Sequence, residues 1–338
     1  MNIAGNENEL ITANNYVTLE QINKNHWNII NDVPAIFFAK VGAAVMLNRK
    51  RLCRKSFLLD NNTMAYMFDK SKWNYNFGKT LFDTIDLTLL AQIGAIPSYN
   101  ASDVENIEIL MPHLKEQSKI GDLFTNIDNL ITLHQRKCDT LVNVKKSLLE
   151  KMFPKNSSNI PEIRFKEFTD VWEQRKLANV FNYERPDKYI VSSTEYLEFG
   201  PTPVLTANKA FILGYTTEKN KYVNSKESII FDDFTLDTKF VDFPYMVKSS
   251  AIKILTLKDA TKDNIRFNFE LLSNHKFNML GHARHYISVV QPEEVFTTNK
   301  QEQDKIGELF TNLDNLITLH QHKELKRRND NNEHLRWQ

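Results

Sequence analysis

One stretch of this chain occurs twice, at residues 116–137 and again at residues 302–323. The two copies differ at only four of 22 positions, and they lie 186 residues apart. Similarity at a fixed distance identifies an internal repeat, and this distance is too long for one unit of a solenoid. The chain is therefore predicted to consist of two halves, each a globular part followed by the same element.

The repeated stretch has the spacing of a long amphipathic helix. In the first copy, Ile120, Ile127 and His134 lie seven residues apart. Leu123 and Leu130 follow the first two by three places, and Phe124, Ile131 and Cys138 follow all three by four places. This heptad period is typical of a coiled-coil seam. The two helices are predicted to bury their stripes against each other or against partner helices, with an ordinary core helix as the alternative. The predicted spacer seam is Ile120, Leu123, Ile127, Leu130, His134, Leu141, Leu148, Ile306, Leu309, Leu313, Leu316 and His320.

Composition disfavours a membrane or secreted protein. The 338 residues suffice for about two domains, and 41% hydrophobic with 25% charged residues is typical of a globular protein. No apolar run approaches the roughly 18 residues of a membrane helix, and no secretory signal pattern follows Met1. Cys53 and Cys138 lack the spacing of metal ligands, so we expect reduced thiols in a cytoplasmic protein.

The motifs of several enzyme classes are missing. The nine glycines form no G-x-G, so a dinucleotide-binding loop of the usual kind is not expected, and G-x-S-x-G and H-E-x-x-H are absent too. His282 and His285 have no acidic or thiol partner near them in sequence, which favours a loop or binding surface over a metal site. The chain is therefore predicted to be non-catalytic, with no metal and no cofactor of its own.

A segment in the middle of the chain suggests a family. The run Pro161-Glu-Ile-Arg-Phe165 continues to Leu177, and a long variable region and the repeated helix follow it. This order resembles the specificity subunit of type I restriction–modification systems, over nearly the whole chain. The resemblance implies an α+β fold: two mixed, strand-rich target recognition domains joined by two long antiparallel helices that form a coiled-coil spacer.

The resemblance also implies a function. Each recognition domain would read one half of a bipartite target in double-stranded DNA. The implied protein partners are two modification (methyltransferase) subunits and the restriction (motor–nuclease) subunits. S-adenosylmethionine, ATP and magnesium would belong to those partners, which would carry out adenine methylation and ATP-dependent cleavage. The alternative is a truncated or silent allele that acts only as a coiled-coil interaction protein, binding modification subunits without reading DNA.

The expected domain boundaries follow from the repeat. The predicted order is a first recognition domain at 1–112, a first spacer helix at 113–155, a second recognition domain at 156–298, a second spacer helix at 299–328 and a polar tail at 329–338. At the offset of the repeat, the counterpart of Pro161 would precede Met1. We therefore expect the first recognition domain to be N-terminally truncated.

Within the first domain, residues 33–46 are predicted to form a buried strand pair, in which Gly42 allows a turn or a bulge. Residues 48–55 form a basic run, which is interpreted equally well as a phosphate-contacting loop or as a solvated turn.

The DNA-binding candidates are polar residues of the two variable regions, because Asn and Arg match adenine and guanine edges and Lys suits phosphate. In the first region they are Lys40, Arg49, Lys50, Arg51, Ser98, Tyr99 and Asn100. In the second they are Thr206, Asn208, Lys209, Lys248, Ser249, His282, Arg284 and Tyr286.

Overall fold

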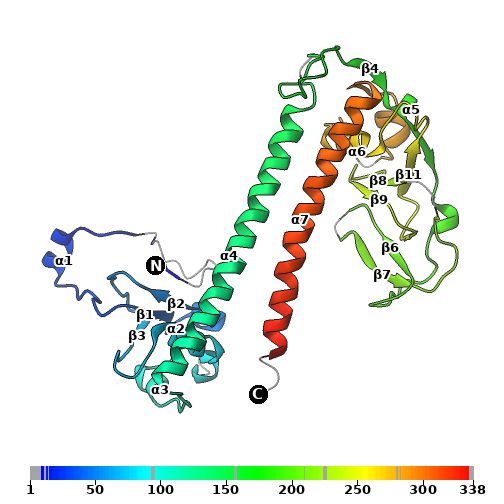
Figure 1. Ribbon diagram of the computed structural model, residues 1–338. Coiled ribbons are helices and arrows are strands. Elements are labelled where there is room, and N and C mark those ends of the chain that lie inside the picture. The colour runs from blue at the N-terminus through cyan, green and yellow to red at the C-terminus, as the bar shows by residue number, and fades with distance from the viewer. Residues whose placement is uncertain are drawn as a thin grey trace. The chain divides into compact units, whose positions relative to one another are not determined.

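The computed structural model describes residues 9–10, 13, 15–92, 96–155, 158–208, 210–223, 227–278, 281 and 283–334, and for residues 322–334 it describes the backbone only. The chain divides into two compact units. The first unit comprises Met1–His134 with Glu324–Gln338, and the second comprises Gln135–Lys323. Each of the two long helices, α4 (Leu114–Lys151) and α7 (Lys300–His334), has residues in both units (Figure 1).

The first unit is built on a three-stranded antiparallel sheet in the order β2-β1-β3. The central strand β1 is buried along its whole length, and Ile36 lies opposite Leu52 on one side and Tyr66 on the other. Before α4, the elements of this unit are α1 (Leu19–Asn25), β1 (Ala35–Ala39), the 3₁₀ helix η1 (Ala43–Leu47), β2 (Lys50–Cys53), β3 (Thr63–Met67), α2 (Tyr75–Thr84), the 3₁₀ helix η2 (Leu87–Leu90) and α3 (Ala101–Glu105).

The predicted strand pair at residues 33–46 is half correct. Its first part is β1, but the chain then enters η1 instead of a second strand. Gly42 has φ of 90°, a conformation that suits glycine and takes the chain out of the strand. The partners of β1 are β2 and β3, which come later in the chain.

The second unit contains more strands. Its largest sheet has the order β5-β11-β8-β9 and is antiparallel throughout, and smaller sheets have the orders β10-β6-β7 and β12-β4. Between α4 and α7 lie β4 (Glu173–Lys176), α5 (Leu177–Val180), β5 (Phe181–Glu184), the 3₁₀ helix η3 (Asp187–Tyr189), β6 (Thr202–Leu205), β7 (Ile212–Thr216), β8 (Ser228–Asp232), β9 (Thr238–Val241), β10 (Met246–Val247), β11 (Ile252–Leu257), α6 (Ile265–Asn274), the π-helical turn η4 (Tyr286–Val290) and β12 (Glu294–Thr297).

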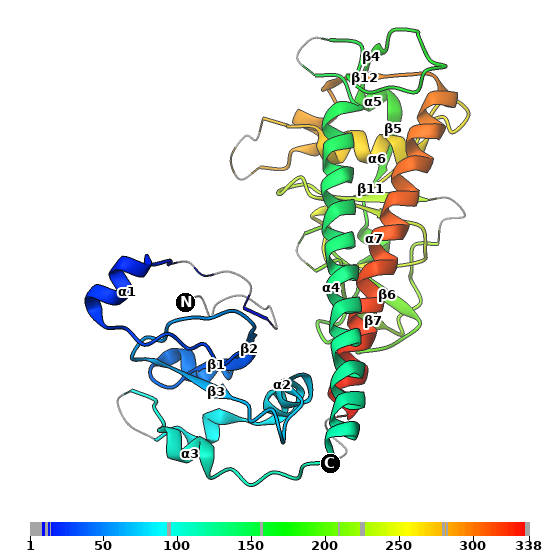
Figure 2. The same cartoon turned by 60° about the vertical axis from the view of Figure 1, so that its left-hand side comes forward.

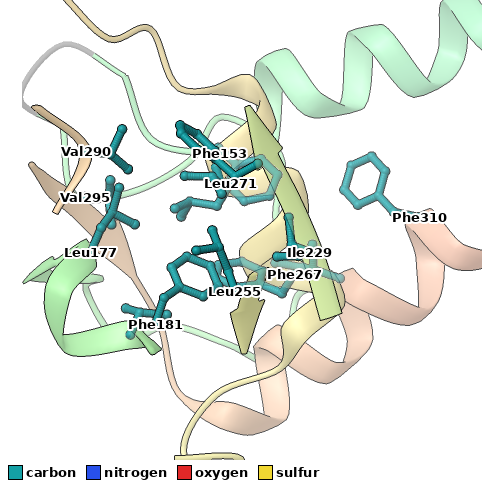
Figure 3. Packing of buried hydrophobic residues seen from close by; sticks show 14 of the residues in the cluster. Phe153, Leu177, Phe181, Ile229, Leu255, Phe267, Leu271, Val290, Val295 and Phe310 are labelled. Atoms are coloured by element: carbon teal, nitrogen blue, oxygen red, sulfur yellow. The ribbon is translucent and has the colours of Figure 1, made fainter. Parts of the chain in front are cut away.

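The core of the second unit joins both long helices to the sheet. The ring of Phe153, just after α4, lies 5.4 Å from that of Phe267 in α6 and 6.2 Å from that of Phe310 in α7. Figure 3 shows these rings beside sheet residues such as Ile229 and Leu255. Burying each such side chain contributes roughly 1.5–3 kcal/mol. Much of the stability of this unit therefore depends on the docking of its helices.

Within the second unit, α4 and α7 run antiparallel. Lys145 Nζ donates to Asp314 of α7 at 2.8 Å, whereas Phe153 lies beside Phe310, so α7 residue numbers fall as α4 numbers rise. Figures 1 and 2 both show the two helices side by side over this part. Lys145 also donates to Glu270 of α6 at 3.1 Å, which adds a polar contact among the three helices.

The predicted seam holds for only part of its length. Leu141, Leu148 and Leu309 pack against the core that contains Ile306 and Leu313. His320 is buried, and Ile120, Ile127 and His134 are half-buried. Leu123, Leu130 and Leu316 are exposed, so the prediction that they lie in a buried seam is wrong. A heptad pattern predicts which residues share one helix face, but it does not say how far that face is covered.

The predicted helix ends differ slightly from the observed ones. The first helix was expected at 113–155 and extends over Leu114–Lys151, because the chain turns at Met152 and Phe153 to enter the core. The second was expected to end at 328, but the backbone remains helical to His334. Among the helices of the described residues, none has the length and apolarity required to cross a membrane.

Each unit has a joint where a short helix begins against a long one. In the first unit, Asn74 caps α2 by accepting from the backbone N–H groups of Asn76 and Phe77, both at 3.0 Å. Gln117 of α4 accepts from Asn74 N at 2.8 Å and donates to the carbonyl oxygen of Pro112 at 2.9 Å. A buried amide with all these partners fixes the start of α2 on α4.

The joint of the second unit repeats this geometry. Asn264 caps α6 by accepting from Phe267 N at 2.9 Å, and Gln303 of α7 accepts from Asn264 N at 2.9 Å. Gln303 also donates to the carbonyl oxygen of Thr298 at 2.7 Å. Gln303 and Thr298 are the counterparts, at the offset of the repeat, of Gln117 and Pro112 in the first joint. The repeat therefore includes the way in which each long helix holds its globular part.

Replacing the helix glycine of either joint by alanine is expected to destabilise its unit, although alanine is the better helix former by about 1 kcal/mol. A methyl group at Gly121 would lie 2.6 Å from Phe77 N, and one at Gly307 would lie 2.6 Å from Asn264 Oδ1. The docked helix would have to shift, at a cost of about 1–3 kcal/mol. Urea unfolding of Gly121→Ala and Gly307→Ala measures this loss.

Matched controls lie on the exposed faces of the same helices. Asn126→Ala and Asn312→Ala are expected to raise stability by a few tenths of a kcal/mol, because only helix propensity changes there. Glycine variants that are as stable as these controls would contradict the close docking.

Candidate nucleic-acid interface

In the second unit, several candidates lie where neighbouring strands end. β6 and β10 are parallel neighbours, so Thr206 and Lys248, which follow them, lie at the same edge of that sheet. Thr206 Oγ1 donates to Asn208 Oδ1 at 3.0 Å, and Asn208 Nδ2 donates to Asp232 Oδ2 at 3.2 Å. The amide of Asn208 is thus positioned against the end of β8.

A buried ion pair supports the adjoining loop. Lys253 Nζ lies 2.8 Å from Asp233 Oδ2, and both side chains are buried. Asp233 Oδ1 also accepts from Tyr286 N at 2.8 Å, and its carbonyl oxygen accepts from His285 N at 2.9 Å. These bonds attach the start of η4 to the end of β8, and they hold the neighbouring Arg284 in place at the surface.

Arg284 presents a cation beside an exposed aromatic ring. Its guanidinium lies 5.7 Å from the ring centroid of Phe234 and donates to the carbonyl oxygen of Ser250 at 3.3 Å. Lys248 is exposed, and Ser249 is half-buried and accepts from Ala251 N at 3.3 Å. The turn at 248–251 therefore places Lys248 and Ser249 close to Arg284.

Two candidates of the second unit are buried, and two cannot be placed. Tyr286 is 1% exposed, with its ring 5.2 Å from that of Tyr183 and 5.4 Å from that of Phe231. Burial raises the pKa of its hydroxyl, and the ring supports the core, so the structure does not present it to a ligand. Thr206 is also buried and acts through Asn208. Lys209 and His282 lie outside the described residues.

In the first unit, the basic run does not form a loop. Lys50 and Arg51 lie in β2, where they are 6% and 2% exposed. Lys50 Nζ donates to the carbonyl oxygen of Ile85 at 2.5 Å, and burial lowers the pKa of its amine from 10.5 to about 8. Both interpretations of the run placed it on the surface, and both are wrong for these two residues. A phosphate contact requires a solvent-facing cation.

Tyr99 is buried as well. Its hydroxyl donates to the carbonyl oxygen of Ala39 at 2.5 Å, and burial raises the pKa of that hydroxyl to about 12. The bond from Tyr99 N to the carbonyl oxygen of Lys40, at 3.1 Å, and the bridge between Val41 and Ser98 place Lys40 and Ser98 side by side. Lys40 and Ser98 are half-buried.

The remaining candidates of the first unit have other positions. Arg49 is half-buried, and Asn100 is exposed at the start of α3 in a capping box with Asp103. The surface side chains left in this unit are thus fewer than the sequence suggested.

Phe234 is a candidate that the sequence did not indicate. It is an exposed aromatic residue in the turn after β8, and it lies under Arg284. A phenylalanine directly after Asp232 and Asp233 was a weak signal of an exposed turn, because acidic pairs favour turns. Over the part of the chain that the structure describes, no three His, Cys, Asp or Glu side chains are grouped to hold a metal ion.

Comparison with known proteins identifies the family. The chain matches the sequence model of the type I restriction modification DNA specificity domain over residues 2–143 and 169–327. It is 40% identical over 116 residues to the type I restriction enzyme EcoR124I/EcoR124II specificity subunit of Escherichia coli, covering 33% of this chain and 29% of that protein. It is 31% identical over 108 residues to the MjaVIII specificity subunit of Methanocaldococcus jannaschii, covering 31% of this chain and 25% of that protein. These matches therefore span less than a third of the relatives' lengths.

A solved structure shares the fold. The crystal structure of the type I restriction-modification system S subunit from M. genitalium superposes with a TM-score of 0.67 at 16% identity, covering 91% of this chain and 83% of that chain. The resemblance inferred from the repeated helix and the Pro161 segment is thereby confirmed. With one matched region in each half and most of its length covered, this chain belongs to the type I restriction modification DNA specificity domain family.

Proposed function

We propose that this chain reads a bipartite DNA sequence as the specificity subunit of a type I restriction–modification complex. The observation that carries the proposal is the repeated joint, in which Asn74 with Gln117 and Asn264 with Gln303 attach two different globular parts to near-identical helices. Two different recognition domains, attached to their helices in the same way, suit a target with two different halves. The family match supports DNA as the ligand.

The long helices are proposed to act as a spacer. Over the second unit they run antiparallel and are tied by Lys145 and Asp314, which makes a stiff pair. A stiff pair would hold two readers at a set separation and so set the length of the unread gap between half-sites. Exposed apolar residues of α4, among them Phe124, Leu133 and Val144, would dock the modification subunits.

Base and phosphate contacts in the second reader are proposed for Asn208, Lys248, Ser249 and Arg284, with Phe234 beside them. In the first reader they are proposed for Lys40, Arg49, Ser98 and Asn100. In this proposal the chain performs no chemical step. Methylation and cleavage, with S-adenosylmethionine, ATP and magnesium, take place in the partner subunits.

The experiment that tests the function is a gel shift on duplex libraries in which two random half-sites are separated by gaps of varying length. The full chain is used with and without the modification subunits of its own system. Enrichment of one sequence pair at one gap length supports reading by a fixed spacer. Capture of modification subunits without any enriched sequence would instead favour the interaction-only protein.

Arg284→Ala is expected to weaken binding to the enriched site by about 1–3 kcal/mol, roughly 5- to 150-fold, if its guanidinium contacts a base edge. The side chain is exposed and the backbone of its loop is held through Asp233, so folding should be retained. Titration of the site against a scrambled duplex measures the change. Lys258→Ala, an alanine variant at an exposed lysine just beyond the end of β11, is the control. Equal binding by Arg284→Ala and wild type would remove Arg284 from the interface.

A further inference from the structure

The two units share a common plan that extends beyond the long helices. β8 and β1 are the central strands, and each has a residue just past its end, Asp233 or Lys40, whose carbonyl oxygen accepts a backbone bond from a later segment. The donors are His285 N at 2.9 Å and Tyr99 N at 3.1 Å, and these residues lie 186 positions apart, the offset of the repeat. By their order and pairing, β11 followed by α6 corresponds to β3 followed by α2, since β11 pairs with β8 as β3 pairs with β1. The second unit can therefore serve as a template: what packs on a surface there indicates what would fit the equivalent surface of the first unit.

In the second unit, the segment before and including β5 covers the free edge of β12, the outer edge of β11 and one side of the hydrophobic core. β4, α5 and β5 form a continuous run from Glu173 to Glu184, in which β4 pairs with β12 and β5 pairs with the outer edge of β11. Between them, Leu177 N and Ala178 N donate to the carbonyl oxygens of Glu293 and Gln291, both at 2.9 Å. Leu177 then enters the core beside Val290 and Val295 (Figure 3).

The residues that precede this run attach it to α7 and to α6. Arg164 donates to both carboxylate oxygens of Glu302 at 2.7 and 2.8 Å, and Glu302 is fully buried. Trp172 is buried, with its ring 5.6 Å from that of Phe267. The segment Ile160–Glu184 is therefore a clamp of one charge pair, one aromatic ring and two strand pairings.

In the first unit, the corresponding strand edges are open among the described residues. β3 pairs with β1 on one side only, whereas its counterpart β11 pairs on both. Residues 108–111, the counterpart of β12, form an extended run between α3 and α4 with no backbone hydrogen bond to another described residue (Figure 2). Within that run Leu110 is 95% exposed. The outer edge of β3 and the run 108–111 thus both have backbone groups without a partner among the described residues.

A cavity lies beside these edges. It has a volume of about 140 Å³ and is lined by Tyr66, Trp73, Phe82, Val104 and Ile109, among others. Val104 and Ile109 are the counterparts of Val290 and Val295, which hold Leu177 in the second unit. The cavity is therefore at the position that the apolar turn α5 fills there.

The position equivalent to the Arg164–Glu302 ion pair has no arginine among the described residues of the first unit. Glu116 is the counterpart of Glu302, but it is exposed, and the structure records no ion pair between it and another described residue. The residue before the capping asparagine also differs: Trp73 stands where the second unit has Asp263, the partner of Arg175, and it adds an aromatic wall to the cavity. A ligand of this surface thus needs an arginine for Glu116 and an apolar turn for the cavity.

We propose that this surface of the first unit, formed by the outer edge of β3, residues 108–111, the cavity and Glu116, binds an extended segment of the Ile160–Glu184 type presented by another polypeptide. The segment would add one strand to β3 and another to residues 108–111, place an apolar turn in the cavity and pair its arginine with Glu116. Addition of a strand to a free sheet edge is a common mode of peptide recognition.

The test uses a fluorescein-labelled peptide of residues 160–184 and the full chain. Saturable binding by fluorescence anisotropy is expected, with new hydrogen-exchange protection at residues 64–67 and 108–111. Glu116→Gln should weaken binding about tenfold or more, because a charge-assisted bidentate pair is lost. Ile109→Lys, at a partly exposed position that needs no refolding, should weaken it by blocking the cavity.

Two further variants separate this site from its counterpart. Glu302→Gln in the second unit should leave peptide binding unchanged, since its site is already occupied by the chain's own Arg164. Glu116→Arg should abolish binding of the natural peptide and restore it for a peptide carrying Arg164→Glu. Absence of binding, or loss of binding through Glu302→Gln with no effect of Glu116→Gln, would overturn the proposal.

Discussion

Replacing Arg164 by alanine is expected to destabilise the second unit by about 3–5 kcal/mol. The guanidinium donates to both oxygens of Glu302 at 2.7 and 2.8 Å, and Glu302 is 0% exposed. Among the described residues, alanine would leave that carboxylate buried with Thr298 Oγ1, at 2.5 Å, as its one remaining side-chain donor. The cost comes mainly from the uncompensated charge, because the pair itself gains little over an apolar contact of the same shape.

Urea unfolding, followed by the fluorescence of Trp172 with Trp27, Trp73 and Trp337 replaced by phenylalanine, measures this loss. The double variant Arg164→Met with Glu302→Gln should recover most of the stability, since no charge is then buried. Lys305→Ala is a matched control, because the pair of Lys305 with Glu167 also links the segment before β4 to α7 but is about half exposed. Such pairs contribute about 0–1 kcal/mol, so an Arg164→Ala variant as stable as Lys305→Ala would contradict the prediction.

Replacing Lys50 by methionine is expected to stabilise the first unit by about 1–3 kcal/mol at pH 7. Burial lowers the pKa of the Lys50 amine to about 8, with Lys79 acting in the same direction and Asp83 and Asp86 opposing it. At 1.36 kcal/mol per pKa unit, a shift of this size means that the protonated amine destabilises the folded unit by about 3 kcal/mol. Methionine removes that penalty and loses the bond to Ile85, which contributes about 1 kcal/mol.

The pH dependence has a definite sign. Between about pH 8 and pH 10.5 the unfolded chain binds the Lys50 proton and the folded unit does not, so this residue makes the free energy of unfolding rise with pH across that window. The Lys50→Met protein should lack that rise. Urea unfolding at pH 7 and pH 10, followed by Trp73 fluorescence in a variant without the other tryptophans, measures both effects. Lys55→Met, at an exposed lysine of the same basic run, should change neither, and a destabilised Lys50→Met protein would contradict the argument.

The elements that depend on local pattern were predictable. The heptad period placed the two long helices to within a few residues of α4 and α7, except at the end of α7. The near-identity of residues 116–137 and 302–323 implied two equivalent halves, and the paired contacts of Gln117 and Gln303 agree with it. Both signals lie within a single stretch, where side-chain spacing translates directly into a helix face.

The candidate site was less predictable. Lys50 and Arg51 were expected at the surface because charge runs usually are, but β2 is buried on both faces. Tyr99 and Tyr286 lie among polar residues in the sequence, yet segments far away in the chain enclose both rings. Asn208 is brought to the end of β8 by its bond to Asp232, and Arg284 by its ion pair with Asp233 at 3.9 Å, neither of which sequence spacing indicates.

The sequence alone predicted the two helices, the two-part organisation and the family. The helices follow from the spacing of residues that are close together in the chain, and the other two follow from comparing the two copies of the repeat and the segment that begins at Pro161. Only the tertiary structure decided which helix and strand faces are covered, because that depends on contacts between distant segments. It buries Lys50, and it leaves Leu123 and the outer edge of β3 uncovered. A side chain's free energy depends on whether water remains around it, and that is decided only when segments from different parts of the chain pack together.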